Sequence, residues 1–304
     1  MQRVVFLVAW GLVRFVQLLP LKAVAQMGRV AGTLAYHLDG RHRRVALNNL
    51  TRCFGQEMSA SQIRALAQEH FRRLGENYCA AVKSAAMPWT ELSRHVEFVG
   101  TDKVPKPDEA NGSRSCVIAI GHFGNFEVFS RYGNMHPGYR CAATYRALKQ
   151  PLLNQLLQSL RSRGGCHFFE RRSEARALMS ALAEGKLLLG LLADQHAGER
   201  GVRVPFFGQE CSTTPAPAIL ALRYDCPLFT AICYRVALAY WRIEVGDAIP
   251  TQAEGRPRSA EEIMTDVTRA FEAAVRRDPA NWFWVHNRWK PFRSRAGQKA
   301  ADPA

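Results

Sequence analysis

The chain has 304 residues, of which 47% are hydrophobic and 22% are charged, and its formal net charge is +15 at pH 7. This length and balance predict a globular protein of one large or two small domains and exclude a disordered chain. The positive charge calls for an acidic partner or surface. Nucleic acid has no support beyond the charge, because the cations are spread along the chain and no zinc-finger spacing or single-strand-binding aromatic pattern is present.

The first segment, Val4 to Leu19, is apolar except for Arg14 and Gln17. A helix of this length spans about 24 Å, short of the roughly 20 residues that cross a bilayer comfortably. Three interpretations stay open: a short membrane anchor, a helix lying in the membrane interface, or a buried helix of a soluble protein. Pro20 follows in place of a small-residue cleavage site, so we expect no removed signal peptide.

A second apolar segment runs from Ala23 to Leu38, and its Gly28 and Gly32 have the spacing that allows close helix packing. The basic cluster Arg41-His-Arg-Arg44 that follows is either a solvated face or a contact with anionic lipid. Ser59-x-x-Gln62 predicts a capping box at the start of a further helix.

From Val96 onward, strand and helix patterns alternate, which predicts an α/β fold in a single domain with a mixed, mainly parallel sheet. We therefore divide the chain into a membrane-associating helical region, 1–40, and a catalytic domain, 41–304. The expected strands are Cys116–Ile120, Arg140–Thr144, Leu187–Ala193, Leu228–Val236 and Trp241–Val245, and the expected helices are Pro151–Leu160, Ala175–Leu182, Pro217–Tyr224 and Ala260–Arg277.

The stretch after the first of these strands carries a candidate for chemistry. His122 follows the apolar strand, at the carboxyl end where open α/β sheets keep their ligands. Gly124 and Asn125 predict a turn, with Asn125 as the N-cap of a helix whose first turn holds Glu127. His122 and Glu127 would point about 140° apart on one continuous helix, so they can meet only if the backbone bends between them.

If the two side chains meet, the carboxylate would fix the imidazole tautomer, and His122 would act as a general base for a hydroxyl. The alternative is a hydrogen-bonded structural histidine, and the spacing alone leaves both open. Arg146, next to a predicted strand end, could bind a phosphate or an oxyanion or be an ordinary surface arginine. Asp194 and Gln195 end another strand, where Asp194 could bind a substrate hydroxyl, pair with an arginine or cap a turn.

The ordered set of motifs resembles the bacterial acyltransferases that add the late, secondary acyl chains to lipid A, a branch of the lysophospholipid acyltransferase superfamily. His122-Phe-Gly-Asn-Phe-Glu127 is similar to the family's His-x4-(Asp/Glu) motif. The further matching blocks are Tyr145–Leu153, Ala193-Asp-Gln-His196, Gly201–Gly208 with Thr213-Thr214, and Trp284–Lys290. Ala147, Gln150 and the Pro215-Ala-Pro217 run depart from the pattern, which affects the choice of acceptor rather than the reaction.

The resemblance implies a glycerolipid-acyltransferase-like fold at the cytoplasmic face of a bacterial inner membrane. It implies an acyl carrier protein thioester as donor, a hydroxyl of a phosphorylated, acylated glucosamine disaccharide as acceptor, and no cofactor. His122 would then be the base and Glu127 its orienting group, with Arg146, Arg172, Asp194 and Gln195 binding substrate; Arg171 and Arg172 are expected to open a helix.

Two other functions remain possible: the same reaction on another lipid acceptor (a glycerophospholipid, a lipo-amino acid or another glycolipid), or a non-catalytic basic protein of the membrane surface. The eight cysteines contain no Cys-x2-Cys pair, and no His or Cys cluster has the spacing of metal ligands, so we expect no metal in catalysis. No cysteine is placed to act as a nucleophile, so we expect direct transfer without an acyl-enzyme. The loop Val202–Thr214 would line an acyl groove or belong to the core. Trp282, Phe283, Trp284 and Trp289 would form either a membrane interface or a buried aromatic corner.

Overall fold

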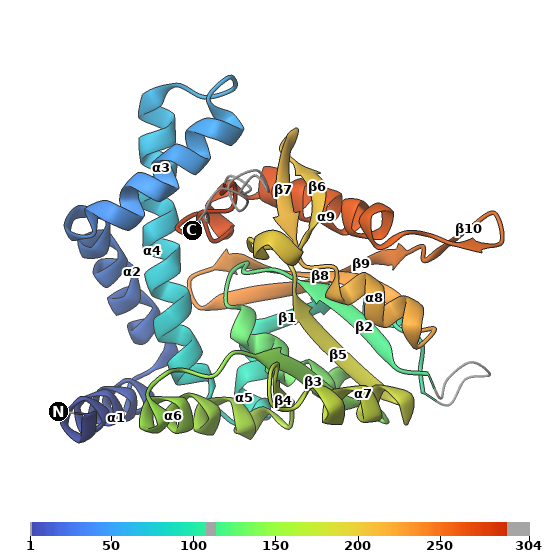
Figure 1. Ribbon diagram of the computed structural model, residues 1–304. Helices are drawn as coiled ribbons and strands as arrows, with labels where there is room; N and C mark the ends of the chain where they lie inside the picture. The colour runs from blue at the N-terminus through green and yellow to red at the C-terminus, as the bar shows by residue number, and fades with distance from the viewer. Residues whose placement is uncertain (1, 108–113, 291–304) are drawn as a thin grey trace, which may run out of the picture.

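The computed structural model describes residues 2–107 and 114–290 and shows a seven-stranded sheet in the order β1-β9-β8-β2-β5-β3-β4 (Figure 1). Strands β8, β2, β5, β3 and β4 run parallel, β9 is antiparallel to β8, and β1 is parallel to β9. The predicted mixed, mainly parallel α/β sheet is confirmed. The strands of this sheet are β1 (Val96–Val99), β2 (Cys116–Ile120), β3 (Arg140–Tyr145), β4 (His167–Glu170), β5 (Leu187–Leu192), β8 (Leu228–Ala237) and β9 (Tyr240–Ile249).

Helices flank the sheet, and five α-helices, α1 to α5, precede it in the chain (Figure 1). The α-helices are α1 (Gln2–Leu18), α2 (Leu21–Leu38), α3 (Gly40–Phe54), α4 (Ala60–Ser84), α5 (Trp89–Leu92), α6 (Pro151–Arg161), α7 (Ala175–Ala183), α8 (Ala216–Arg223) and α9 (Ala260–Arg277). The capping box predicted at Ser59 and Gln62 is present, with both reciprocal hydrogen bonds, so it opens α4.

Two expectations about local structure were wrong. The stretch 202–214 forms a hairpin of β6 (Val202–Phe206) and β7 (Gln209–Thr213) rather than a loop. Its inward side chains, including Val204 and Phe206, belong to the core. The segment after Asn125 is a 3-10 helix, η3 (Phe126–Met135), and Asn125 holds its N-cap position without a side-chain capping bond.

Helices α2 and α4 cross at glycines. A Cβ atom added to Gly28 would lie 2.4 Å from the carbonyl oxygen of Gly75, and one added to Gly32 would lie 2.1 Å from that of Phe71. Only residues without a Cβ allow backbones this close, so the close packing predicted from Gly28 and Gly32 is confirmed, with α4 as the partner.

Gly75→Ala is therefore expected to destabilise the fold by about 1–3 kcal/mol, because its Cβ would lie 2.1 Å from the Gly28 carbonyl oxygen and 2.8 Å from the Gly32 nitrogen. Backbone atoms cannot rotate away, so α2 must shift. Denaturant unfolding measures the loss. Gly11→Ala is the matched control: Gly11 lies in α1 with nothing within 4 Å of the added Cβ, and alanine there should cost nothing.

A buried carboxylate joins these helices to the sheet. Glu76 of α4 is fully buried and accepts hydrogen bonds from Arg29 of α2 at 3.4 Å and from Arg235 of β8 at 2.8 Å. The backbone N–H of Ala239 donates to its other oxygen at 3.0 Å. Glu76 thereby links three segments that are far apart in the chain.

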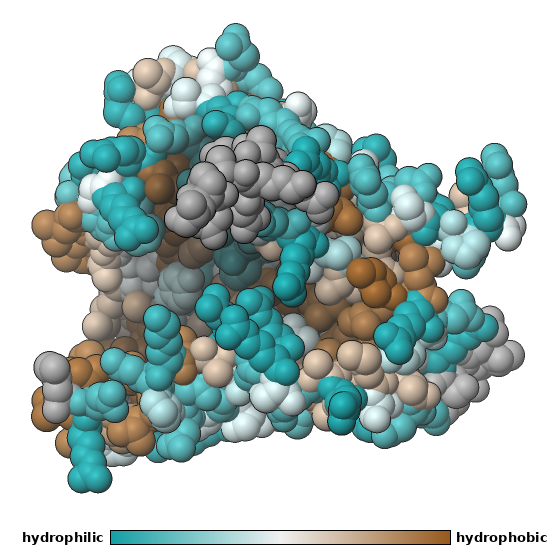
Figure 2. All heavy atoms as spheres, viewed as in Figure 1, coloured by the Kyte–Doolittle hydropathy of each residue, from teal (hydrophilic) through white to brown (hydrophobic). Residues whose placement is uncertain are grey.

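Helix α1 exposes its apolar side chains and contains no buried residue. Leu7 is 61% exposed and Phe15 is 53% exposed. Figure 2 shows hydrophobic residues gathered over α1 and along the outer side of α2. The interpretation of this segment as a buried helix is therefore wrong. None of the helices in the described parts of the chain is both long and apolar enough for a membrane crossing.

The aromatic residues near the carboxyl end are core residues, with Trp282, Trp284 and Trp289 at most 7% exposed. Trp282 and Trp284 meet edge to face with ring centroids 4.8 Å apart, and Phe206 stacks on Trp289. Of the two interpretations of this cluster, the buried aromatic corner holds for the three tryptophans, whereas Phe283 is only partly buried. The corner packs behind the strand ends that carry the candidate site.

Candidate active site

The pairing of β2 with β5 brings His122 and Asp194 together. The two parallel strands place Ile120 opposite Leu192, so the residues two positions further along, His122 and Asp194, leave the sheet side by side. Strands β3 and β4 end at the same edge because they run parallel to β5. His122, Arg146 and Asp194-Gln195 follow strand ends as predicted, and the parallel pairing brings these ends to one edge of the sheet.

Asp194 is 2% exposed and accepts three hydrogen bonds. The backbone N–H of His122 donates to Oδ2 at 2.8 Å, the indole N–H of Trp282 donates to the same oxygen at 2.8 Å, and Nδ1 of His122 lies 2.8 Å from Oδ1. Burial raises the pKa of Asp194, but the positive charge on His122 and these hydrogen bonds outweigh it and lower the pKa to about 2. Asp194 is thus ionised at neutral pH.

An ionised carboxylate can only accept, so Nδ1 of His122 carries a proton, and in the neutral form of the ring the lone pair is then on Nε2. The side-chain N–H of Gln195 points to that Nε2 from 3.4 Å. The rings of Phe126 and Phe283 lie on either side, with centroids 4.8 and 5.5 Å from that of His122. The arrangement leaves His122 with a fixed tautomer and an acceptor nitrogen.

Glu127 has a different partner from the one expected. Nε of Arg161, in the last turn of α6, donates to Oε2 of Glu127 at 2.9 Å, and a second guanidinium nitrogen contacts Oε1. The chain does bend at Gly124, where φ is +51°, but the bend directs Glu127 toward α6 rather than toward His122. The carboxylate that contacts the His122 ring in this structure is that of Asp194.

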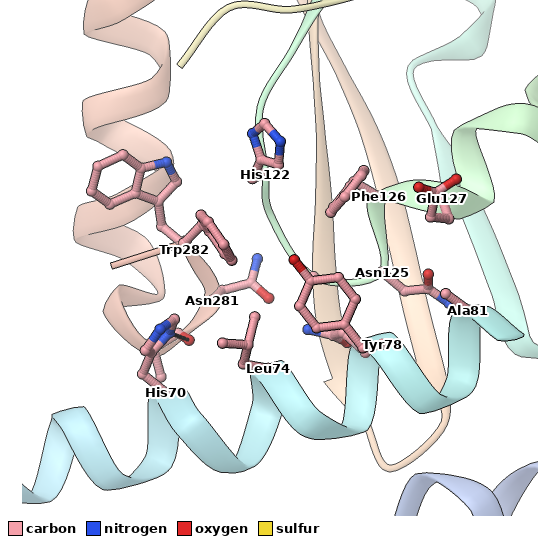
Figure 3. A pocket seen from close by; sticks show the side chains of 14 residues that line it. His70, Leu74, Tyr78, Ala81, His122, Asn125, Phe126, Glu127, Asn281 and Trp282 are labelled. Carbon is pink, nitrogen blue, oxygen red and sulfur yellow. Dashed lines mark hydrogen bonds between the residues drawn. The ribbon is translucent and has the colours of Figure 1, made fainter. Parts of the chain in front are cut away.

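A pocket separates α4 from the loop that carries His122 (Figure 3). It encloses about 370 Å³, counting solvent space at its mouth. Figure 3 shows the side chains of His70, Leu74 and Tyr78 rising from α4 toward His122, with Asn281 and Trp282 at one side. His122 and Glu127 both line the pocket, at different places along it.

The predicted substrate-binding arginines lie on the surface. Arg146 directly follows β3 and is exposed, and Arg172 follows β4 and is exposed as well. Arg171 and Arg172 do not open a helix as expected: they occupy a turn closed by hydrogen bonds to Glu170, and α7 begins only at Ala175. Both arginines nevertheless stand at the sheet edge that carries His122.

Sequence reasoning missed three contributors to the site: Arg161 as the partner of Glu127, Trp282 as a donor to Asp194, and the α4 side chains that wall the pocket. Capping and periodicity report on local structure, and each of these contacts joins segments more than 30 residues apart. The strand-end position of Asp194 was the signal that could have suggested its pairing with His122.

No group of His, Cys, Asp and Glu side chains within residues 2–107 and 114–290 has an arrangement that could hold a metal ion. The cysteines are free, and Cys116 and Cys233 are fully buried. Burial raises the pKa of the Cys233 thiol to about 12, so it is not a thiolate at neutral pH.

The sequence matches the model of the bacterial lipid A biosynthesis acyltransferases over residues 1–291, nearly the whole chain. The chain belongs to this family. It is therefore an acyltransferase, and a histidine with a fixed tautomer beside a pocket is the kind of group that acyl transfer to a hydroxyl needs. A comparison with curated proteins finds no match.

Proposed function

We propose that this acyltransferase moves a fatty acyl chain from a thioester of acyl carrier protein to a hydroxyl of a lipid A precursor, with His122 as general base. One observation carries the proposal: Nδ1 of His122 contacts the buried, ionised carboxylate of Asp194. This contact leaves Nε2 of the ring, beside the pocket, as the nitrogen that can accept a proton. Family membership supports the class of acceptor.

In the proposed reaction the acceptor hydroxyl displaces Gln195 from Nε2 of His122 and gives its proton to that nitrogen while its oxygen attacks the thioester carbonyl. The tetrahedral intermediate then breaks its C–S bond. The leaving thiolate takes the proton from His122, and an ester remains on the acceptor. Asp194 stabilises the imidazolium that forms between these steps.

Glu127 would then act through Arg161 rather than through His122. Its carboxylate and the guanidinium of Arg161 are each less than a quarter exposed and form a two-point ion pair beside the pocket. We assign Glu127 the role of holding Arg161 in position. The positive charge of Arg161 can then face the thioester carbonyl or a substrate phosphate. The dyad inferred from the His-x4-Glu spacing becomes, in this proposal, two pairs: His122 with Asp194, and Glu127 with Arg161.

Arg146 and Arg172, exposed at the carboxyl ends of neighbouring strands, would bind phosphate groups of the acceptor. The net charge of +15 suits both an acidic carrier protein and an anionic membrane. The exposed apolar face of α1 supports a helix that lies in the interface of the inner membrane, on its cytoplasmic side, where its arginines can reach lipid headgroups.

Mass spectrometry of lipid A tests the proposal in cells that lack this gene. Loss of one acyl mass is expected, with restoration by the wild-type chain and by His37→Ala but not by His122→Ala, because only His122 accepts the hydroxyl proton. His37, an exposed residue of α2, is the matched control. If lipid A keeps its mass in cells that lack the gene, the acceptor is a different lipid.

A further inference from the structure

Helix α4 presents one tyrosine to the pocket beside His122. Tyr78 is 47% exposed and lines the same pocket as His122 and Glu127. Figure 3 shows its ring rising from α4, with the hydroxyl at the end that points toward His122. A molecule bound in the pocket can therefore reach this hydroxyl.

The hydroxyl of Tyr78 makes no hydrogen bond to any group within residues 2–107 and 114–290. Two neighbouring donors of the pocket wall are already occupied. Nδ2 of Asn281 donates to the carbonyl oxygen of Cys233 at 2.9 Å, and the indole N–H of Trp282 donates to Asp194 at 2.8 Å. Tyr78 thus keeps a polar hydrogen that a substrate can use.

The protonation state of Tyr78 suits a donor. Partial burial and the negative charge of Glu127 raise the pKa of Tyr78, so the phenol keeps its proton at neutral pH. A phenol O–H donates most strongly to an oxygen that carries negative charge. In the proposed reaction, such an oxygen forms when the acceptor hydroxyl attacks the thioester carbonyl.

The place where this oxyanion forms follows from the role of His122. The acceptor oxygen that gives its proton to Nε2 becomes bonded to the carbon that bears the oxyanion. With one hydrogen bond and two covalent bonds between them, the oxyanion lies within roughly 5 Å of Nε2. A donor that points toward His122 from the wall of the same pocket meets this requirement.

We propose that Tyr78 is a further catalytic residue, whose hydroxyl donates a hydrogen bond to the oxyanion of the tetrahedral intermediate. The inference rests on the proposed function, in which His122 takes the proton of the acceptor. Tyr78 keeps its own proton throughout: its hydrogen bond strengthens as charge develops on the carbonyl oxygen and weakens when the C–S bond breaks. An oxyanion accepts more than one hydrogen bond, so Arg161 can act on the same oxygen.

Steady-state kinetics of purified Tyr78→Phe, with donor and acceptor varied in turn, test the proposal. The variant keeps the ring and loses only the hydroxyl. Its kcat should fall about 10- to 100-fold with both KM values within twofold of wild type, because the lost interaction forms only in the transition state. The loss lies at the lower end for an oxyanion donor because water can partly replace a half-exposed hydroxyl.

Tyr224→Phe is the matched control. Tyr224 directly follows α8 and precedes β8, so it lies at the amino-terminal edge of the parallel strands, opposite to the edge that carries His122. Its kcat should stay within twofold of wild type. The melting temperature of Tyr78→Phe should equal that of wild type, because the lost hydroxyl has no partner in the protein.

Two donor analogues separate the transition state from the ground state. A fluorinated ketone in place of the thioester adds water at its carbonyl carbon and resembles the tetrahedral intermediate, whereas the ketone without fluorine stays planar. In Tyr78→Phe, the inhibition constant of the fluorinated ketone should rise by about the factor by which kcat falls. That of the planar ketone should stay within twofold of its wild-type value.

A wild-type kcat in Tyr78→Phe would overturn the proposal, and so would a raised KM with unchanged kcat. A lower melting temperature together with an equal rise in both inhibition constants would show a structural role instead, which overturns it as well. The proposed function fails by a different result, namely acyl transfer to the lipid A precursor by His122→Ala. An active Tyr78→Phe beside an inactive His122→Ala would remove the role of Tyr78 alone.

Discussion

Asp194→Asn is expected to lower kcat for acyl transfer about 10²- to 10⁴-fold while leaving the KM values close to wild type. The asparagine side chain fits the same space, and its oxygen can still accept from Trp282 and from the backbone N–H of His122. Its NH₂ group, however, would face Nδ1 of His122 and donate to it. The ring proton would then sit on Nε2, the nitrogen that has to accept the hydroxyl proton.

Glu127→Gln is the informative comparison, because it disrupts the ion pair with Arg161 and leaves the contact between His122 and Asp194 intact. It should also reduce transfer, through misplacement of Arg161. Single-turnover rates of both variants, measured with saturating donor, compare the two roles. Wild-type rates in Asp194→Asn together with an inactive Glu127→Gln would show that His122 works with Glu127, as the spacing of the motif first suggested.

Glu76→Ala is expected to destabilise the protein by about 3–5 kcal/mol, because it leaves Arg29 and Arg235 as partly buried charges without their shared carboxylate. The N–H of Ala239 would lose its acceptor too. Denaturant unfolding monitored by tryptophan fluorescence measures the change. In the folded state, Trp241 reports on this region, since its indole N–H donates to Asn77, the residue after Glu76.

The matched control for Glu76 is Glu57→Ala. Glu57 pairs with Arg276 at 3.1 Å, but both side chains are about half exposed, so solvent screens the pair and its loss should cost within about 0.5 kcal/mol. Equal effects of the two substitutions would contradict the view that the buried carboxylate holds the amino-terminal helices to the sheet.

The parts of the fold that depend on neighbouring residues were predictable. The strand Cys116–Ile120 and the helix Ala260–Arg277 have the predicted bounds, because an apolar run between turn residues and a Ser cap before a periodic stretch are local signals. The hairpin of β6 and β7 was missed because Pro205 and Gly208 interrupt the run and resemble loop punctuation.

The candidate site was predictable only in part, for a physical reason. His122 and Asp194 could each be placed at a strand end, but the contact between them depends on β2 and β5 being neighbours, and the two residues are 72 positions apart. Glu127 was assigned to His122 because it is near in sequence. The partner that competes for it, Arg161, lies at the end of a helix whose position no local pattern reveals.

Helix α4 has consequences for how the sequence can change over evolutionary time. One side of it carries Gly75 and Glu76, which meet α2 and β8, and another carries the pocket residues around His70 and Tyr78. Beyond Ala65, Tyr78 is the one exposed residue of this helix, and it lines the pocket. Neutral drift in α4 should therefore concentrate in residues 60–65, where Ile63 alone is buried, and the buried positions of the remaining turns should accept mainly paired, compensating replacements.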